Sequence, residues 1–249
     1  MSSLPLLCAR CMKLKDRSDF SKSQLKKKEL RVCTECSKAM TTQGQETTRK
    51  GNEAVFVPPA RLFKPLSGAA ADKADRMTCL TMHQPWASLL VYGIKRAEGR
   101  GWTTDFRGRL WIHAAAKEPT PELIASCEEH YREIYRLHGD SITIDFPKHY
   151  PTSALVGCVD VVDVVPFQDL SAMHIPSSVE EEEMGSPFVF LCQNYQRLML
   201  PFSLKGEHKL WKMNPRDVKS CQSIMKDSVS PFPVDFYSLA YAYYESQSS

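Results

Sequence analysis

Residues 83–100 read HQPWASLLVYGIKRAEGR, and we expect the rest of the fold to be organised around them. The first half of this stretch is typical of a short helix, because Pro85 is tolerated in a first helical turn and apolar residues follow it. Gly93 suits the left-handed conformation in which many helices end. Residues 94–100 favour a strand or loop, so the stretch predicts a tight helix-to-strand turn.

Polar side chains gather around this predicted turn. In a strand, Glu98 and Arg100 would lie on one face, with Lys95 on the other unless a bulge breaks the alternation. A buried glutamate needs a partner, and either cation could supply it. Gln84, just before the helix, carries donor and acceptor groups that could hydrogen-bond a base edge. The turn is therefore the first candidate for a binding site.

Around this turn the sequence closely resembles the activating signal cointegrator homology (ASCH) domain. The pattern G-x-K-x-x-E-x-R at 93–100, after HQPW at 83–86, carries the resemblance. The further family motifs follow in family order: RGRLWI at 107–112, AAK at 115–117, GCVD at 157–160, SPFVF at 186–190 and LWK at 210–212. The ordered set covers about residues 79–212. It implies a small β-barrel related to the PUA fold, which binds RNA or modified bases in many proteins.

The periodicity of the same region predicts an α+β fold. Strands are expected at 79–82, 109–115, 154–165, 188–192, 197–202 and 210–212, with 188–192 and 197–202 forming an antiparallel pair. Thr120 begins a helical pattern that Gly139 ends, and residues 214–230 are a second helix candidate. The glutamates at 180–183 are expected in an exposed loop. The predicted architecture is a PUA-like β-barrel with flanking helices, preceded by a small zinc finger and a flexible linker.

The N-terminal region carries two C-x-x-C pairs separated by twenty-one residues. An odd total of nine cysteines, in the reducing compartment that we expect, favours metal binding over a disulfide framework. Four thiolates can hold one structural Zn²⁺, and the expected ligands are Cys8, Cys11, Cys33 and Cys36. In zinc-finger peptides such a metal supplies roughly 10–16 kcal/mol of apparent folding free energy. Residues 19–25 loosely resemble a Cys-rich finger of fungal heterochromatin adaptor proteins.

Four segments are expected along the chain: a four-cysteine zinc finger at 1–40, a largely disordered linker at 41–76, the ASCH domain at 77–214 and a C-terminal extension at 215–249. In the linker, the alanine run at 69–71 fits an extended or flexible tether. Residues 55–63 form an apolar patch that could dock on the following domain. The aromatic residues of the extension are expected to pack back on the barrel, with a partner contact as the alternative.

Six Lys/Arg between residues 95 and 117, close in sequence to three tryptophans, predict a nucleic-acid-binding site. Basic groups neutralise phosphates and aromatic faces stack bases, a combination typical of single-strand or end recognition. The predicted phosphate contacts are Lys95, Arg100 and Lys117, the predicted pocket residues are Gln84, Trp86 and Glu98, and the other predicted site residues are Arg107, Arg109, Trp211 and Lys212. Trp102 is expected to be exposed. The expected ligand is RNA or DNA.

An enzyme is the first alternative. Some bacterial relatives of this domain resemble amidohydrolases that act on acylated cytidine with a Lys and a Thr three residues later. Here Lys95 is present but Glu98 stands at the Thr position, so the hydroxyl nucleophile is missing and no catalytic residue is assigned. Lys95 and Glu98 could act as base and acid if their pKa values were pushed apart. The second alternative is a protein-interaction adaptor that uses the zinc finger.

The charge distribution and the resemblance together suggest a cellular role. Residues 1–50 carry twelve Lys/Arg and five Asp/Glu, a balance of +7, whereas the remainder carries twenty and twenty-four, a balance of −4. The basic residues at 26–31 could contact phosphate or act as a nuclear import signal. The resemblance implies transcription coactivation or RNA processing, with proteins of those processes as partners. We expect a nuclear protein, with the cytoplasm as a second location and no membrane association.

Overall fold

A computed structural model of the chain describes residues 6–7, 14–15, 17–21, 34, 62–139 and 142–248. The chain divides into two compact units, Met1–Val55 and Phe56–Ser249. In the first unit, β1 (Leu6–Leu7) pairs antiparallel with β2 (Leu14–Lys15), and the short 3-10 helix η1 spans Arg17–Asp19. None of the helices in the described ranges is long and apolar enough to cross a membrane.

The four predicted zinc ligands, Cys8, Cys11, Cys33 and Cys36, lie outside the described residues, as does the basic segment at 26–31. Across the described ranges, no group of three or more His, Cys, Asp or Glu side chains could hold a metal ion. The zinc finger therefore stays a prediction.

The second unit is built on a curled, mixed sheet of seven strands. The strands are β3 (Thr78–Met82), β4 (Ala97–Arg100), β5 (Gly108–Ala114), β6 (Ala154–Pro166), β7 (Phe188–Ser203), β8 (Leu210–Lys212) and β9 (Met225–Asp227). Their order is β4-β7-β6-β5-β3-β8, with β9 added to β7. The β3–β5 pair is parallel and the other neighbours are antiparallel. β4 and β8 stand at the two ends of this order and, among the described residues, do not pair with each other, so the sheet is a half-barrel.

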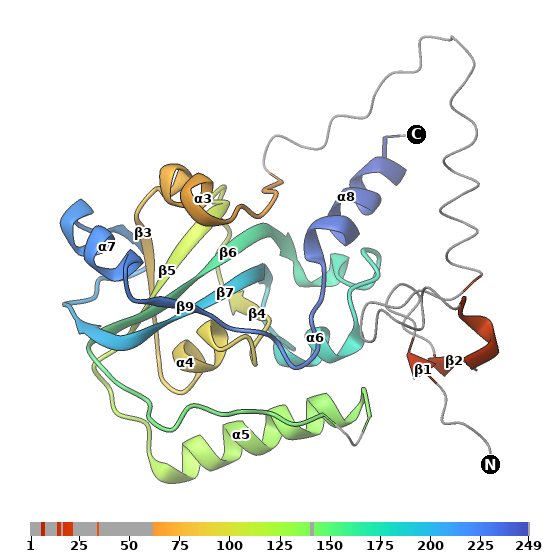
Figure 1. Cartoon of the computed structure of the whole chain (residues 1–249), viewed down its shortest axis with the longest axis horizontal. Helices are drawn as coiled ribbons and strands as arrows, with labels where there is room; N and C mark the ends of the chain where they lie inside the picture. Colours follow the sequence, from red (N-terminus) through yellow and green to blue (C-terminus); the bar gives the residue numbers. More distant parts are fainter. Residues whose placement is uncertain are drawn as a thin grey trace. The chain divides into compact units, whose positions relative to one another are not determined.

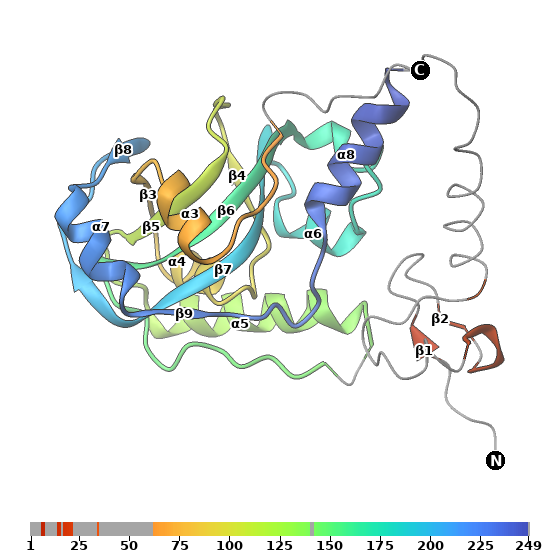
Figure 2. The ribbon, with the colours of Figure 1, turned by 45° about the horizontal axis from the view of Figure 1, so that its top comes forward.

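Helices cover both sides of this sheet. They are α3 (Gly68–Ala74), α4 (Trp86–Val91), α5 (Pro121–Arg136), α6 (Ser177–Glu182), α7 (Pro215–Gln222) and α8 (Phe236–Ser246), with a 3-10 turn η3 at Phe167–Asp169. α4 and α5 lie on one side of the sheet and α3 and α7 on the other, while α6 and α8 stand at one end (Figures 1 and 2). Flanking helices on a curled sheet confirm the predicted α+β class.

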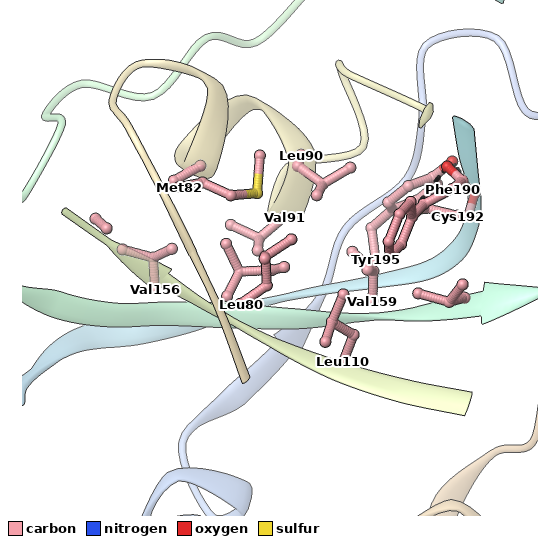
Figure 3. Close-up of a cluster of buried hydrophobic side chains, with 14 of the residues drawn as sticks. Leu80, Met82, Leu90, Val91, Leu110, Val156, Val159, Phe190, Cys192 and Tyr195 are labelled. Carbon is pink, nitrogen blue, oxygen red and sulfur yellow. Dashed lines mark hydrogen bonds between the residues drawn. The ribbon is translucent and has the colours of Figure 1, made fainter. Parts of the chain in front are cut away.

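Two apolar clusters fix the helices to the sheet. One lies between α4 and the strands and includes Leu90 and Val91 from the helix with Leu80, Leu110 and Val159 from β3, β5 and β6 (Figure 3). The other cluster attaches α7 to the opposite face of the sheet. Burying one such aliphatic side chain contributes about 1.5–3 kcal/mol. The position of α4, and with it the start of the turn at 93, is therefore set by the core.

The chain from 188 to 203 forms one continuous strand, so the predicted antiparallel pair at 188–192 and 197–202 is wrong. Between them lies Asn194, which has a φ of 49°, and the register of β7 against β6 shifts around it. A polar residue in the left-handed region marks a bulge here and not a hairpin turn. β7 therefore stays paired with β6 along most of its length.

Residues 69–71, which the alanine run assigned to an extended or flexible tether, belong to α3 instead. Asp72 and Asp75, at the end of that helix, contact the Arg109 side chain on β5. Nearby, the Phe63 N–H donates to the Val162 carbonyl at 3.0 Å. Alanine has the highest intrinsic helix propensity, which favours α3, and these polar contacts attach the segment to the sheet. At the other end of the chain, α8 buries Phe236 and contacts β6 and β7, so the aromatic extension packs back on the sheet.

Candidate functional site

The helix-to-strand turn forms as the sequence predicts. α4 ends at Val91, and Gly93 takes a φ of +72°. The Leu89 carbonyl then accepts the N–H groups of Ile94 and Lys95, each at 3.0 Å. A Cβ on Gly93 would stand 3.0 Å from the Tyr195 ring, so this position requires glycine both for its backbone and for its packing. The turn therefore depends on glycine at this position, and residues 95–100 follow directly after it.

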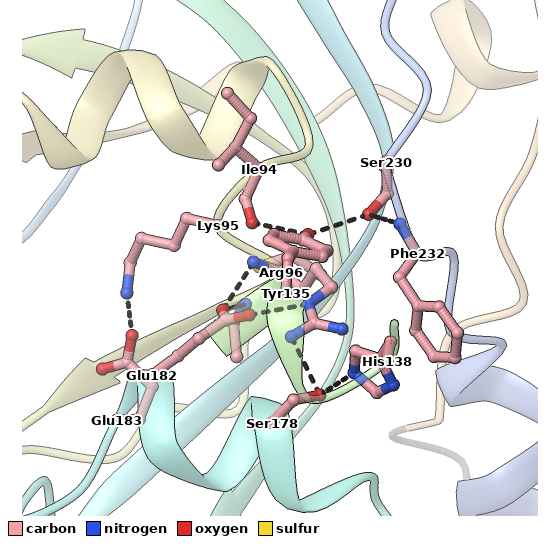
Figure 4. Close-up of polar contacts among 12 residues, drawn as sticks. Ile94, Lys95, Arg96, Tyr135, His138, Ser178, Glu182, Glu183, Ser230 and Phe232 are labelled. Carbon is pink, nitrogen blue, oxygen red and sulfur yellow. Dashed lines mark hydrogen bonds and ion pairs between the residues drawn. The ribbon is translucent and has the colours of Figure 1, made fainter. Parts of the chain in front are cut away.

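Three of the predicted site residues meet just after this turn. The Lys95 ammonium is 3.3 Å from the Glu98 carboxylate, and the Arg100 guanidinium is 2.8 Å from the other oxygen of the same carboxylate. Lys95 also contacts the carboxylate of Glu183, which sequence reasoning missed (Figure 4). Lys95 is only 3% exposed. Two acids therefore neutralise a lysine that was predicted to face a phosphate.

Arg96, next in sequence, is fully buried and holds Glu182 (Figure 4). One Glu182 oxygen accepts from Arg96 Nε at 2.6 Å, and the other accepts the backbone N–H groups of Arg96 at 2.7 Å and Ala97 at 3.3 Å. Burial alone would lower the pKa of Arg96. The opposing effect of Glu182 and the other neighbours is larger, so the pKa of Arg96 is raised. The Tyr135 ring lies 4.8 Å from the guanidinium. The arginine therefore stays charged in the core.

These contacts overturn the expectation that residues 180–183 form an exposed loop. α6 runs from Ser177 to Glu182, and the carboxylates of Glu182 and Glu183 are buried against the turn. A buried cation needs a partner, and this acidic run supplies two. The sequence does contain two adjacent cations, Lys95 and Arg96, and two adjacent acids, Glu182 and Glu183, of complementary charge. More than eighty residues separate the two pairs, however. Only the fold brings them together.

Arg107 and Arg109 are also buried and paired. Arg107 Nε donates to the Asp163 carboxylate at 2.7 Å, and Arg109 donates to Asp72 at 2.6 Å. Only 4% of Arg107 and 7% of Arg109 is exposed, so little of either side chain is open to a phosphate. Their assignment to a nucleic-acid-binding site stays a prediction.

The remaining predicted residues lie apart from this cluster. Trp86 is 36% exposed and Lys117 is exposed. Trp211 and Lys212 belong to β8, at the opposite end of the strand order from β4, and the Lys212 ammonium donates to the Arg76 carbonyl at 2.7 Å. Trp102, expected to be exposed, packs edge-on against Phe190. The structure therefore does not bring the predicted residues into one site.

Gln84 is buried, and its amide group is hydrogen-bonded within the fold. Its Nε2 group donates to Ser88 Oγ at 2.7 Å and to the Pro151 carbonyl at 2.8 Å, and its Oε1 accepts the Ser88 N–H at 3.1 Å. Both amide hydrogens are therefore used within the fold, and Oε1 already accepts one hydrogen bond. Instead, Gln84 fixes two residues that line a nearby hollow, so its role is to position the wall of that hollow.

This hollow lies between α4, the segment 145–151 and strands β6 and β7, and has a volume of about 430 Å³. It combines cationic, aromatic and apolar side chains, and its lining residues are Ser88, Tyr92, Asp145, Phe146, Lys148, His149, Pro151, Val156, Arg197, Leu198, Met199 and Pro201. We call it the Arg197 hollow. The Arg197 guanidinium lies 4.7 Å from the centre of the Tyr92 ring, so cation and aromatic face share one wall.

A second cation stands beside Arg197. In the β7–β9 ladder Lys226 is directly opposite Arg197, so the two side chains emerge on the same face of the sheet. Like charges opposite each other are destabilising, and in the part of the chain that the structure describes neither is ion-paired with a carboxylate. Lys148 and Lys226 are exposed. Sequence reasoning missed these residues because each is a single cation in an ordinary strand or loop.

Comparisons with known proteins show which family the chain is related to. The ASCH domain family model matches residues 80–214. Activating signal cointegrator 1 of Homo sapiens and that of Mus musculus are each 44% identical over 138 residues, which is 55% of this chain. The match spans only 22% of the length of those two relatives. The crystal structure of ASCH from Zymomonas mobilis is 13% identical, covers 62% of this chain and 100% of its own, and superposes with a TM-score of 0.36. The chain belongs to the ASCH domain family.

Proposed function

We propose that this ASCH domain binds nucleic acid, RNA or DNA, at the Arg197 hollow. The observation that carries the proposal is a pair of cations without carboxylate partners: Arg197 lines a hollow that also contains Lys148 and two aromatic rings, and Lys226 lies directly opposite Arg197 on β9. Cations without carboxylate partners can release counterions from phosphates, and aromatic rings can stack bases. Buried ion pairs such as Lys95–Glu183 cannot do either without first being broken.

We further propose a setting in transcription coactivation, with RNA processing as the alternative. Family membership and the 44% identity to Activating signal cointegrator 1 support a nucleic-acid-related coactivator role in general terms. Because the match spans about a fifth of those relatives, their whole-protein activity and partners come here only as proposals. Proteins of transcription or RNA processing are the proposed partners. The nucleus is the proposed location, with the cytoplasm as a second one.

The N-terminal finger is proposed to hold one structural Zn²⁺ through Cys8, Cys11, Cys33 and Cys36. The chemistry of four thiolates in two C-x-x-C pairs supports this assignment. Elemental analysis of the purified chain should give one zinc per molecule. A native protein that contains no zinc would refute the finger and the adaptor role that depends on it.

Fluorescence anisotropy with labelled single- and double-stranded DNA and RNA, each at two salt concentrations, tests the main proposal. Binding should weaken steeply with salt, and Arg197→Ala or Lys226→Ala should reduce the salt slope by about 1 for the lost phosphate contact. Lys219→Ala, on the exposed face of α7, is the matched control and should leave binding unchanged. The absence of binding to every probe at low salt would refute the proposal.

A hydrolase is the second candidate, because Lys95 contacts two carboxylates, Glu98 and Glu183, where the sequence predicted one. A lysine and two acids in contact are the kinds of group that general acid–base catalysis uses. Turnover of an acylated nucleoside that disappears in Lys95→Ala and in Glu98→Gln would support an enzyme. Absence of turnover leaves binding as the function.

A further inference from the structure

We infer that the Arg197 hollow holds a single unpaired nucleotide, with the base inside and the flanking phosphates at its rim. This inference rests on the proposed function and names the form of nucleic acid that the site takes. It is independent of the family signature at 93–100, because none of those residues lines the hollow.

The size of the hollow sets the first limit. A volume of about 430 Å³ lies in the range of sites for small molecules and cofactors, roughly 300–1,000 Å³. A base that is paired and stacked within a duplex cannot enter such a site, because both of its faces and its pairing edge are already occupied. A single-stranded or terminal nucleotide can turn its base inward. The hollow therefore selects for unpaired strands.

The walls supply stacking surfaces. Tyr92 and Phe146 both line the hollow and are only partly buried. Each ring has an arginine against it: Arg197 lies 4.7 Å from the centre of Tyr92, and Arg132 lies 4.8 Å from the centre of Phe146. Aromatic rings and guanidinium planes are the two kinds of surface on which proteins stack unpaired bases. Such stacking tolerates any base, so the walls give affinity with little sequence preference.

One deeper group can read the base edge. Ser88 is almost fully buried, and its Oγ accepts a hydrogen bond from Gln84. Among the described residues no acceptor takes the Ser88 hydroxyl proton, so that proton can be donated into the hollow. A base carbonyl oxygen or ring nitrogen would accept it. Gln84 is thus a positioning residue for the one fixed donor at this depth.

The rim supplies the charge for phosphates. Arg197 lines the strand side, with Lys226 directly opposite it on β9, while Lys148 and His149 line the loop side. A nucleotide has one phosphate on each side of its sugar, so cations on two sides match a strand that passes across the hollow. Asp145 is the one carboxylate in the lining, and it would disfavour a phosphate at its own position.

Three probes of equal length test the inference in low salt: a labelled single-stranded oligonucleotide, the same strand with an abasic central residue, and a blunt duplex. The intact single strand should bind about tenfold more tightly than the duplex and clearly more tightly than the abasic strand, since stacking of one base is worth roughly that factor. Tyr92→Ala should remove most of this preference without changing the salt slope. Tyr92→Phe should retain it.

The controls separate this inference from the proposed function. Tyr237→Ala changes a half-buried tyrosine on α8 and should leave the ratio of single-strand to duplex affinity unchanged. Thermal unfolding and duplex binding of Tyr92→Ala show whether the variant is folded. Equal affinity for all three probes, with loss of binding in Arg197→Ala, would refute the single-nucleotide site and keep the proposed function. No binding of any probe would refute both.

Discussion

The cations of this domain fall into two groups that differ in what neutralises them. The inner cations, Lys95, Arg96, Arg107 and Arg109, are each buried against at least one carboxylate of the same chain. The rim cations are Lys148 and Arg197, which line the Arg197 hollow, and Lys226, which lies opposite Arg197 on β9; none is ion-paired within the described ranges. Leaving a buried charge without its partner costs several kcal/mol of folding free energy, so the inner cations stabilise the fold only while they remain paired. The rim group remains free to bind a polyanion.

The largest expected effect is the loss of an inner cation. Arg96→Ala should lower the free energy of unfolding by about 3–5 kcal/mol, because it leaves the Glu182 carboxylate buried without its guanidinium. Urea denaturation followed by tryptophan fluorescence measures the loss. Arg216→Ala, on the exposed N-terminal turn of α7, is the control and should change stability by less than about 0.5 kcal/mol.

The double variant Arg96→Met with Glu182→Gln tests whether the unpaired Glu182 charge causes the loss of stability. It removes both charges, and the side-chain carbonyl of the new glutamine can still accept the backbone N–H groups of residues 96 and 97. Stability should therefore recover in part relative to Arg96→Ala. A double variant no more stable than the single one would show that packing, and not the unpaired charge, dominates the loss.

The second effect is a dependence of the folding stability on pH. It arises around Arg109, which has three aspartates near it, Asp72, Asp75 and Asp160. Burial raises the pKa of Asp160 to about 6, although the Asn194 amide and Arg109 oppose the shift. Between about pH 4 and 6 the unfolded chain has released this proton and the folded chain has not, so stability from this group falls as pH rises. Asp160→Asn should remove that fall and gain up to about 3 kcal/mol relative to wild type above pH 6.

His138 provides the control of opposite sign. Burial and the nearby Arg96 charge lower the pKa of His138 to about 4. The unfolded chain therefore binds this proton at higher pH than the folded chain, and stability from this group rises with pH between about 4 and 6.5. His138→Gln should accordingly differ from wild type in the direction opposite to Asp160→Asn across this window. A stability difference for Asp160→Asn that is constant from pH 4 to 7 would contradict the assignment.

The local structure of the turn could be predicted from the sequence, because short-range chemistry determines it. Gly93 has the expected left-handed backbone, Thr120 caps α5 by accepting the Leu123 N–H, and β8 forms at residues 210–212. The family resemblance predicted a PUA-like β-barrel with flanking helices, and the structure has a curled half-barrel with flanking helices. The turn and the helix cap depend on residues that are close together in the chain.

The environment of the charges could not be predicted, because it depends on contacts between distant segments. Glu182 and Glu183 look like a solvated acidic run until α6 places them against Lys95 and Arg96. Gln84 looks like a base reader until Ser88 and the Pro151 carbonyl occupy its amide. The same limit hid Arg197 and Lys226, whose proximity depends on the pairing of β7 with β9. Motif order indicated where the domain is but not which cations it exposes.

Arg100 has properties of both groups of cations, so its behaviour tests how the inner and rim cations are distinguished. Its side chain is 24% exposed and is paired with Glu98 at 2.8 Å. If it belongs to the inner cations, Arg100→Ala should lower stability by about 1 kcal/mol and change single-strand affinity less than twofold. Chemical denaturation and anisotropy on the same preparation measure both. A large loss of affinity with little loss of stability would place Arg100 with the rim cations, as the sequence predicted.

The smallest expected change in stability converts a rim cation into an inner one. Lys226→Glu places a carboxylate directly opposite Arg197, so a repulsive pair on β7 and β9 becomes an attractive one. The free energy of unfolding should rise by about 0.2–1 kcal/mol, because opposite charges across an antiparallel ladder are mildly stabilising. Nucleic-acid affinity should fall at the same time, since Arg197 would then be neutralised within the chain. Lys226→Gln separates the two effects, because it should weaken binding less and leave Arg197 unpaired. If Lys226→Glu lowered both stability and affinity, Arg197 and Lys226 would not face each other as the β7–β9 register implies. The distinction between inner and rim cations would then fail for these two residues.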